Sequence, residues 1–297
     1  MKKTLFFLAA ISAFAACSKT EAFKSDQATP ISINVPYPAI ATDTKIAYQS
    51  GSTTKLQWES TDQLKLVVQN AIPATTKNYT DCGVLTTTGG KTATFTGTIP
   101  ADAVSTKYGL ALFPASAFVE FGYSSITGVG YYSKMVANIP VEQDGTGLRY
   151  MIGVYKFKDG ALSNFTWATT MTKITVPGGK GIYKVKFSQQ EKPAAAFSGE
   201  VNIYFKEDDG TKASATTSQG TNKGYDVTVG NGSELSGEIF FTTRGLTSGE
   251  YFILEFFDNA GNLITLKDGK TKLKKTASGS VGNGRIINFG DVSSFFN

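Results

Sequence analysis

The stretch GEVNIYFKEDDG, residues 199–210, alternates apolar and polar side chains and then ends in a turn. Val201, Ile203 and Phe205 fall on one face of an extended chain, while polar or amphipathic residues fall on the other. Asp208-Asp209-Gly210 supplies residues that tolerate positive φ, as a tight hairpin requires. The stretch therefore predicts a half-buried β-strand followed by a hairpin turn.

The same pattern recurs along most of the chain. Short alternating or continuous apolar runs are separated by turns that contain Gly, Asn and Asp, and no apolar period of 3.6 residues persists for three turns. Phe (21), Tyr (13) and Gly (31) are abundant among the 297 residues, which is the usage of strands and tight turns. The sequence predicts an all-β fold, and strands at this spacing are typical of β-sandwiches.

The length of the chain favours two domains. A stretch that contains Gly, Ser and Asn, residues 159–165, separates two strand-rich halves. We therefore expect an N-terminal β-sandwich over residues 30–163 and a C-terminal β-sandwich over residues 164–297.

Residues 1–16 have the pattern of a bacterial lipoprotein signal peptide. Two lysines precede an apolar run that is too short to span a bilayer, and small residues up to Ala16 precede Cys17. We expect cleavage between Ala16 and Cys17, a lipid on the Cys17 thiol, and a flexible tether over residues 17–29. Ser18 stands where an Asp would favour the inner membrane, so we expect an outer-membrane lipoprotein at the cell surface. The alternative is an ordinary secretory signal in which Cys17 has no role.

The composition excludes several classes of function. The chain has no histidine, which excludes a His-dependent triad and a His-ligated metal. Cys82 is the only cysteine besides Cys17, so with Cys17 lipidated we expect no intramolecular disulfide. Cys82 lies in a strand-like stretch with no His, Lys or Arg beside it, so we expect a buried, inert thiol. The net charge of +5 would become +3 without Lys2 and Lys3, which is too weak to indicate nucleic-acid binding. No phosphate-binding loop or paired carboxylates stand out, so we expect no enzyme activity, no cofactor and no metal.

The aromatic residues Trp58, Trp167 and Tyr131-Tyr132 are open to two interpretations. They can belong to a core, or they can form a platform on which sugars stack. Aromatic residues on strands are more often core, so we expect both tryptophans there. Tyr131-Tyr132 lies in a Gly-rich stretch, where both interpretations stay open. An exposed platform would make the protein a surface glycan-binding lipoprotein.

Several motifs occur in the order found in the fimbrillin-like lipoproteins of Bacteroidetes, which are fimbrial subunits. In the N-terminal half they are residues 31–35, Thr44-Lys45, and residues 58–62, 64–68, 95–100 and 108–114. In the C-terminal half they are Phe197-Ser198-Gly199 and the closing segment 284–292. The chain resembles this family over most of residues 29–292.

The resemblance implies two tandem transthyretin-like Greek-key β-sandwich domains. It also implies a structural subunit, or an anchor or accessory component, of cell-surface fimbriae. Its partners would be other fimbrial subunits, the outer membrane through the lipid, and host or bacterial surface ligands. In the family, a protease removes the N-terminal strand, and a strand from a neighbouring subunit fills the groove that is left.

Two segments of this chain correspond to those steps. Residues 31–35 alternate and would form the first strand, and the candidate cleavage site is Lys45-Ile46, where the family has Arg. The candidate donor is the C-terminal segment, because apolar side chains follow its last glycine: Val292, Phe295 and Phe296.

Overall fold

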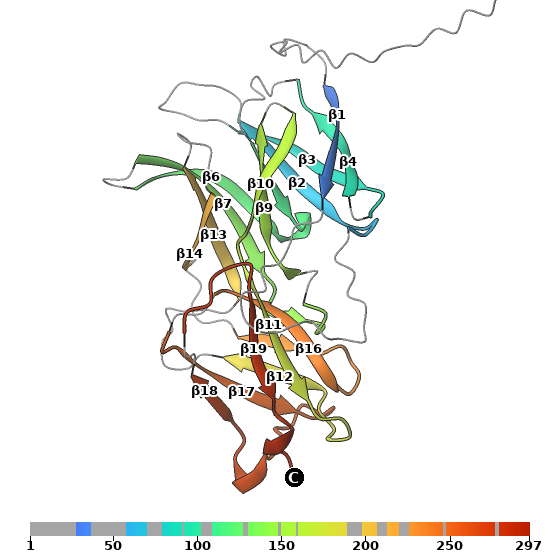
Figure 1. The fold of residues 1–297 in the computed structure, drawn as a ribbon, viewed down its shortest axis with the longest axis vertical. Coiled ribbons are helices and arrows are strands. Elements are labelled where there is room, and N and C mark those ends of the chain that lie inside the picture. The colour runs from blue at the N-terminus through green and yellow to red at the C-terminus, as the bar shows by residue number, and fades with distance from the viewer. Residues whose placement is uncertain are drawn as a thin grey trace, which may run out of the picture.

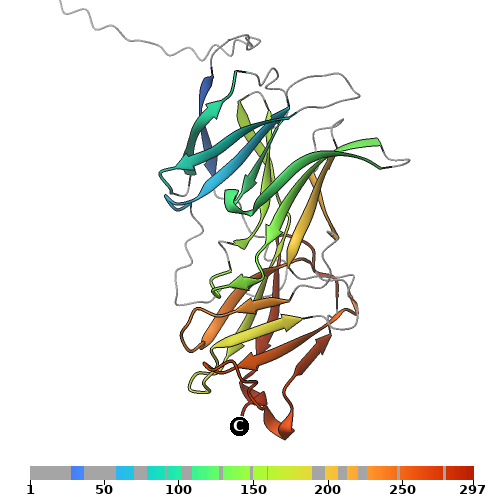
Figure 2. The same ribbon diagram turned by 180° about the vertical axis from the view of Figure 1, so that it is seen from behind.

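The computed structural model describes residues 28–36, 58–69, 79–90, 92–101, 109–126, 130–147, 150–158, 160–188, 198–206, 213–219, 226–245, 248–276 and 279–297. These residues form β-strands joined by turns and by single 3-10 turns, which confirms the all-β prediction. The strands form an N-terminal and a C-terminal unit, stacked along the long axis of the molecule (Figures 1 and 2). Within these ranges, no helix has the length and apolar character needed to cross a membrane.

The N-terminal unit is built on a seven-stranded antiparallel sheet in the order β1-β4-β3-β2-β5-β9-β10. Because β1 lies beside β4 and not beside β2, the first four strands have Greek-key order. The edge strands β1 and β10 contact each other, so the sheet curls around a core on its concave face. The bounds are Thr29–Pro36 (β1), Gln63–Gln69 (β2), Tyr79–Thr87 (β3), Thr92–Ile99 (β4), Gly109–Phe113 (β5), Gly153–Lys158 (β9) and Ala161–Trp167 (β10).

The central strands of this sheet are apolar on both faces. In β5, Ala111 and Phe113 enter the concave core, whereas Leu110 and Leu112 point to the other face. That other face packs against a four-stranded sheet in the order β14-β13-β7-β6. Its strands are Phe118–Ile126 (β6), Gly130–Ile139 (β7), Gly199–Lys206 (β13) and Ala213–Gln219 (β14), and a 3-10 turn at Ala115–Ala117 (η1) precedes β6.

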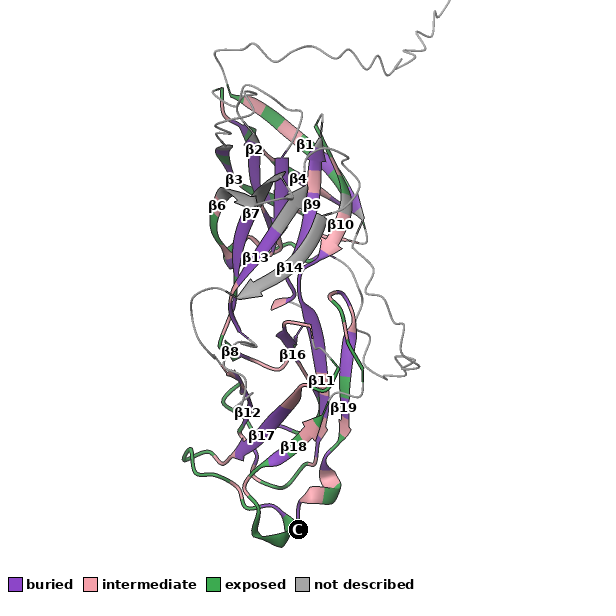
Figure 3. Cartoon of the chain, turned by 90° about the vertical axis from the view of Figure 1, so that its left-hand side faces the viewer, coloured by how far each residue is buried: buried purple, intermediate pink, exposed green. Residues whose placement is uncertain are grey.

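The C-terminal unit is a sandwich of a three-stranded sheet, β16-β11-β19, and a five-stranded sheet, β18-β17-β12-β15-β8. In the three-stranded sheet, β19 runs parallel to β11, and β11 is buried along most of its length (Figure 3). The strands are Glu142–Gln143 (β8), Thr170–Val176 (β11), Lys184–Ser188 (β12), Val227–Val229 (β15), Gly237–Thr243 (β16), Tyr251–Phe257 (β17), Leu273–Thr276 (β18) and Ile286–Asp291 (β19). Single 3-10 turns lie at Lys267–Gly269 (η3) and Ser293–Phe295 (η4).

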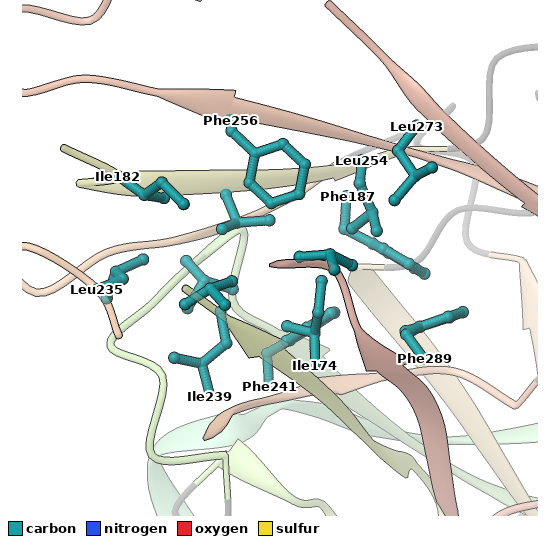
Figure 4. Close-up of a cluster of buried hydrophobic side chains, with 14 of the residues drawn as sticks. Ile174, Ile182, Phe187, Leu235, Ile239, Phe241, Leu254, Phe256, Leu273 and Phe289 are labelled. Carbon is teal, nitrogen blue, oxygen red and sulfur yellow. The ribbon is translucent and has the colours of Figure 1, made fainter. Parts of the chain in front are cut away.

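Aliphatic and aromatic side chains together fill the space between these two sheets (Figure 4). Phe187 of β12 stacks on Phe252 of β17 with ring centroids 5.2 Å apart. Phe252 in turn meets Phe289 of β19 edge-to-face at 4.0 Å. Offset and edge-to-face pairs of this kind add to the apolar burial that holds a sandwich together.

The chain passes between the two units several times. β8 follows β7 of the N-terminal unit but pairs with β15 of the C-terminal unit. β13 follows β12 of the C-terminal unit but pairs with β7. The sheets therefore do not divide at residue 163, where we expected the first domain to end, because Ser163 lies inside β10 and pairs with Lys156 of β9. Alternation identifies a strand, but it carries no information on which sheet the strand joins.

A buried glutamine holds β8, the strand that follows the connection from β7, against β16. Gln143 of β8 is 2% exposed, and its side-chain amide makes two hydrogen bonds to the backbone of Thr242 in β16. Its Nε2 donates to the Thr242 carbonyl at 2.8 Å, and its Oε1 accepts from the Thr242 N–H at 2.7 Å. The Thr242 hydroxyl donates to the Gly147 carbonyl at 2.9 Å. The side chain thus takes the place of one residue of a neighbouring strand.

Candidate functional site

The candidate site is β1 together with the groove that it fills. β1 is an edge strand, and it pairs with β4 along its whole length, from Thr29 opposite Ile99 to Pro36 opposite Thr92. Ile33 and Val35 are buried in the concave core, and Ser32 and Asn34 are exposed. The predicted strand and its alternation are confirmed. Burial of alternate side chains fixes the register of β1, since a slip by one residue would turn both apolar side chains outward.

Trp58 holds the C-terminal end of β1 from inside the groove. The side chain is 1% exposed, and its Nε1–H donates to the Val35 carbonyl at 3.0 Å. The indole meets Phe95 of β4 and Phe113 of β5 edge-to-face, with centroids 4.9 and 5.1 Å apart. The expectation that Trp58 is a core residue is confirmed. Sequence reasoning missed its bond to β1, although a buried indole N–H usually needs an acceptor.

A compact turn sets the position of Trp58. Its backbone exchanges two hydrogen bonds with Gly90, at 2.9 and 2.7 Å. Gly89 beside it has φ +84°, and a Cβ atom there would lie 2.9 Å from the Trp58 carbonyl oxygen, so glycine is required. The turn closes when the Glu59 N–H donates to Asp62 Oδ2 at 2.8 Å. Burial raises the pKa of the Asp62 carboxyl, and this hydrogen bond opposes the rise.

The predicted donor segment lies in the core of its own C-terminal unit. Val292 and Phe296 are buried, and Phe295 is half-buried against the same core. Phe296 meets Phe256 edge-to-face at 5.0 Å, and the Val292 N–H donates to the Thr175 carbonyl at 3.0 Å. η4 makes this segment a 3-10 turn and not an extended strand. Any transfer to another subunit would first require these side chains to leave their own core.

Four of the predicted site residues lie outside the residues that the structure describes. They are the signal cleavage pair Ala16 and Cys17 and the candidate maturation pair Lys45 and Ile46.

Cys82 lies within the described part of the chain, in β3. Its side chain is 8% exposed, in line with the expected buried thiol. Among the residues with described positions, no cluster of three or more His, Cys, Asp or Glu side chains could hold a metal ion.

The two tryptophans do not form a surface platform. Trp58 is 1% exposed and Trp167 is 6% exposed, which confirms that both belong to the core. The side chains of Tyr131 and Tyr132 lie outside the described part of the structure. Where side chains are described, the exposed large apolar residues are aliphatic: Val84, Val119, Val141 and Leu263.

The solved structures that are similar to this chain include two from Bacteroides. A candidate cell adhesion protein from Bacteroides uniformis aligns over 90% of this chain and 94% of its own, with 12% identity and a TM-score of 0.47. A candidate cell adhesion protein from Bacteroides ovatus aligns over 89% of this chain and 92% of its own, with 12% identity and a TM-score of 0.40. No protein-family model and no curated protein sequence matches the chain.

Proposed function

We propose that the chain is a structural subunit, or an anchor or accessory component, of cell-surface fimbriae that assemble by β-strand addition. The observation that carries the proposal is the way β1 is held. It is an edge strand that contributes two buried side chains, Ile33 and Val35, to a core, and its ladder is with β4. A segment of this kind can leave and be replaced by an equivalent strand without changing any other pairing in the sheet.

Removal of β1 would expose both backbone polar groups and apolar side chains in the groove. The backbone donors and acceptors of β4 that now face β1 would lose their partners. The apolar floor formed by Trp58 and Phe95, and the side of the core covered by Ile33 and Val35, would meet water. Both changes are costly, and a strand from another chain that alternates in the same way would reverse both.

Release of β1 requires a cut between β1 and Trp58. Lys45-Ile46 lies in this interval of the sequence, and we propose it as the maturation site. A cut there would remove the covalent link between β1 and the rest of the sheet but leave Trp58 attached to Gly90. The donor would come from another subunit. Its C-terminal segment would serve only after Val292 and Phe296 had left their own core.

The remaining parts of the proposal concern location and partners. The signal pattern supports an outer-membrane lipoprotein anchored through Cys17 at the cell surface. Its partners would be further fimbrial subunits, of the same or a related kind, and surface ligands of host or bacterial cells. The proposal includes no catalytic activity, no cofactor and no nucleic-acid partner.

Lipidation of Cys17 can be tested directly in cells. Metabolic labelling with a fatty acid should mark the wild-type protein and not the Cys17→Ala variant, because the Cys17 thiol is the proposed acceptor. The variant should also leave the membrane fraction. The neighbouring change Ser18→Ala keeps the thiol and is the matched control. Equal labelling of wild type and Cys17→Ala would contradict the anchor.

Strand replacement can be tested with a reversible staple across β1 and β4. Asn34 and Thr94 face each other in the ladder, and the Thr94 hydroxyl donates to the Asn34 Oδ1 at 2.7 Å. The double variant Asn34→Cys/Thr94→Cys should therefore form a disulfide that holds β1 in place. The chain from residue 18 onward would also carry the recognition sequence of a specific protease at positions 44–46.

After cleavage, the reduced protein should form oligomers that resist SDS, while the oxidised protein should stay monomeric. The control is the chain that keeps Asn34 and Thr94 and is cut at the same site. It has no disulfide between β1 and β4, so it should assemble with or without reductant. Deletion of residues 292–297 tests the donor, because it should abolish assembly if that segment supplies the strand. If the cut and reduced protein remains a stable monomer, an uncleaved anchor becomes the better description.

A further inference from the structure

We propose that β1 and the C-terminal unit are energetically coupled through a row of aromatic side chains. Occupancy of the β1 groove would then control the stability of the turn 282–285 and of the start of β19. The row runs through Trp58, Tyr155, Phe165 and Trp167. The inference deepens the proposed function, because strand release at this groove is the event that the row would transmit.

The first step links β1 to the middle of the seven-stranded sheet. The Val35 carbonyl accepts from Trp58 Nε1 at 3.0 Å, so departure of β1 leaves a buried indole N–H without this acceptor. Trp58 packs against Tyr155 of β9, with ring centroids 6.4 Å apart. Tyr155 is 4% exposed and lies in the same buried core as the indole. Because a core is closely packed, a shift of the indole would be passed on to Tyr155.

The second step crosses from β9 to β10. The ring centroids of Tyr155 and Phe165 lie 4.5 Å apart. Those of Phe165 and Trp167 lie 4.6 Å apart, and the planes of these two rings are nearly perpendicular, at 85°. Phe165 occupies the space over Gly153, where a Cβ atom would lie 2.0 Å from the Phe165 Cζ. The absence of a side chain at Gly153 thus leaves room for the Phe165 ring, which lies between Tyr155 and Trp167.

The third step reaches the turn that begins β19. Trp167 packs on Gly284, where a Cβ atom would lie only 2.9 Å from the Trp167 Cδ1. Gly284 also has φ +74°, so this position favours glycine for two separate reasons. Its N–H donates to the Thr169 carbonyl at 2.8 Å, and the Met171 N–H donates to the Arg285 carbonyl at 3.0 Å. A displaced indole would therefore disturb both hydrogen bonds.

The start of β19 belongs to both units. Ile286 is buried in the concave core that also contains Ile33 and Val35, whereas the next residue, Ile287, is buried in the core of the C-terminal unit. Met171 of β11 pairs with Ile286 and shares the concave core with it. A change in the packing of the groove would thus reach the parallel pair β11–β19 through Met171 and Ile286.

Hydrogen exchange at single amides of the stapled, cleaved chain tests the coupling in the monomer, at a concentration below that of any assembly. Reduction should accelerate exchange at Gly284 and Met171 about tenfold, a factor within the usual range for coupled sites. Remote amides serve as internal controls. The Leu235 N–H donates to the Ile182 carbonyl, and the Ile264 N–H donates to the Phe256 carbonyl. Neither should change more than about twofold, since exchange reports local opening.

The variant Phe165→Leu should interrupt the row and keep an apolar side chain over Gly153. In this background, reduction should change exchange at Gly284 and Met171 by less than about threefold, so most of the coupling should be lost. If the cleaved chain unfolds on reduction, the coupling is measured instead in the uncut chain with the substitution Trp58→Phe. This variant removes the bond to Val35 and should raise exchange at Gly284 more than at Leu235.

Three results would overturn the inference. Exchange at Gly284 and Met171 could stay unchanged when β1 is released. The remote amides could accelerate by the same factor, which would mean uniform destabilisation. The effect could persist undiminished in Phe165→Leu. Because exchange is measured on the monomer, a chain that fails to assemble would contradict the proposed function and still show whether the groove and the turn are coupled.

Discussion

Replacing Trp58 with alanine should lower the free energy of unfolding by about 3–5 kcal/mol, the usual cost of removing a large aromatic side chain from a core. The side chain is 1% exposed and packs between Phe95 and Phe113. Its loss would leave a cavity at the end of the groove and remove the donor to the Val35 carbonyl. The effect should therefore appear in the sheet and in the retention of β1 together.

Urea denaturation followed by far-UV circular dichroism measures the loss. Trp58→Phe is the matched variant, because it keeps an aromatic ring but removes the indole N–H. It should cost less, about 1–3 kcal/mol, the range for one buried polar group left unpaired. Val84→Ala, at a position that is 40% exposed, should change little. If Trp58→Ala unfolded like the wild type but lost binding to a ligand, the residue would serve recognition and not the core.

Replacing Gln143 with leucine should cost about 2–4 kcal/mol. The change removes both hydrogen bonds to the backbone of Thr242, and each buried backbone group without a partner costs about 1–3 kcal/mol. The apolar gain from leucine offsets part of this loss. Since Gln143 joins β8 to β16, the variant should also weaken the attachment of the two sheets of the C-terminal unit to each other.

The neighbouring residue provides the control for this prediction. Glu142 precedes Gln143 in the same short strand but is exposed, so Glu142→Gln should change the stability by less than about 0.5 kcal/mol. Both variants can be compared with the wild type by chemical denaturation under identical conditions. An unchanged denaturation midpoint for Gln143→Leu would show that water or another group replaces the amide at Thr242.

The sequence allowed individual strands to be predicted better than their arrangement. Residues 199–210 alternate clearly, and residues 199–206 are indeed a strand, yet β13 pairs with β7 and not with a strand of the C-terminal unit. Alternation reports that one face of a strand is buried, and it is the same whichever sheet buries it. Composition alone predicts a boundary at residue 163, but this residue lies inside the β9–β10 hairpin.

In the candidate site, too, the local elements could be predicted from the sequence, whereas the contacts between distant residues could not. The alternation of residues 31–35 and the turn after Trp58 predicted β1 and a core tryptophan. The bond from Trp58 to Val35 joins residues 23 positions apart, and no local pattern specifies such a contact. At the other end of the chain, apolar side chains suggested a donor segment, but the structure places Val292 and Phe296 in the core of their own unit. Apolar residues near a terminus serve equally well for either purpose.

The parallel pairing of β19 with β11 has a mechanical consequence. β19 starts where the two units meet and runs lengthwise toward the C-terminus at the far end of the molecule (Figure 1). A pulling force on the C-terminus would act along the axis of β19 and slide it against β11, which loads the hydrogen bonds of the ladder together. A force across the strand would break them one at a time. The last strand of the chain is thus oriented to bear tension along the length of the protein.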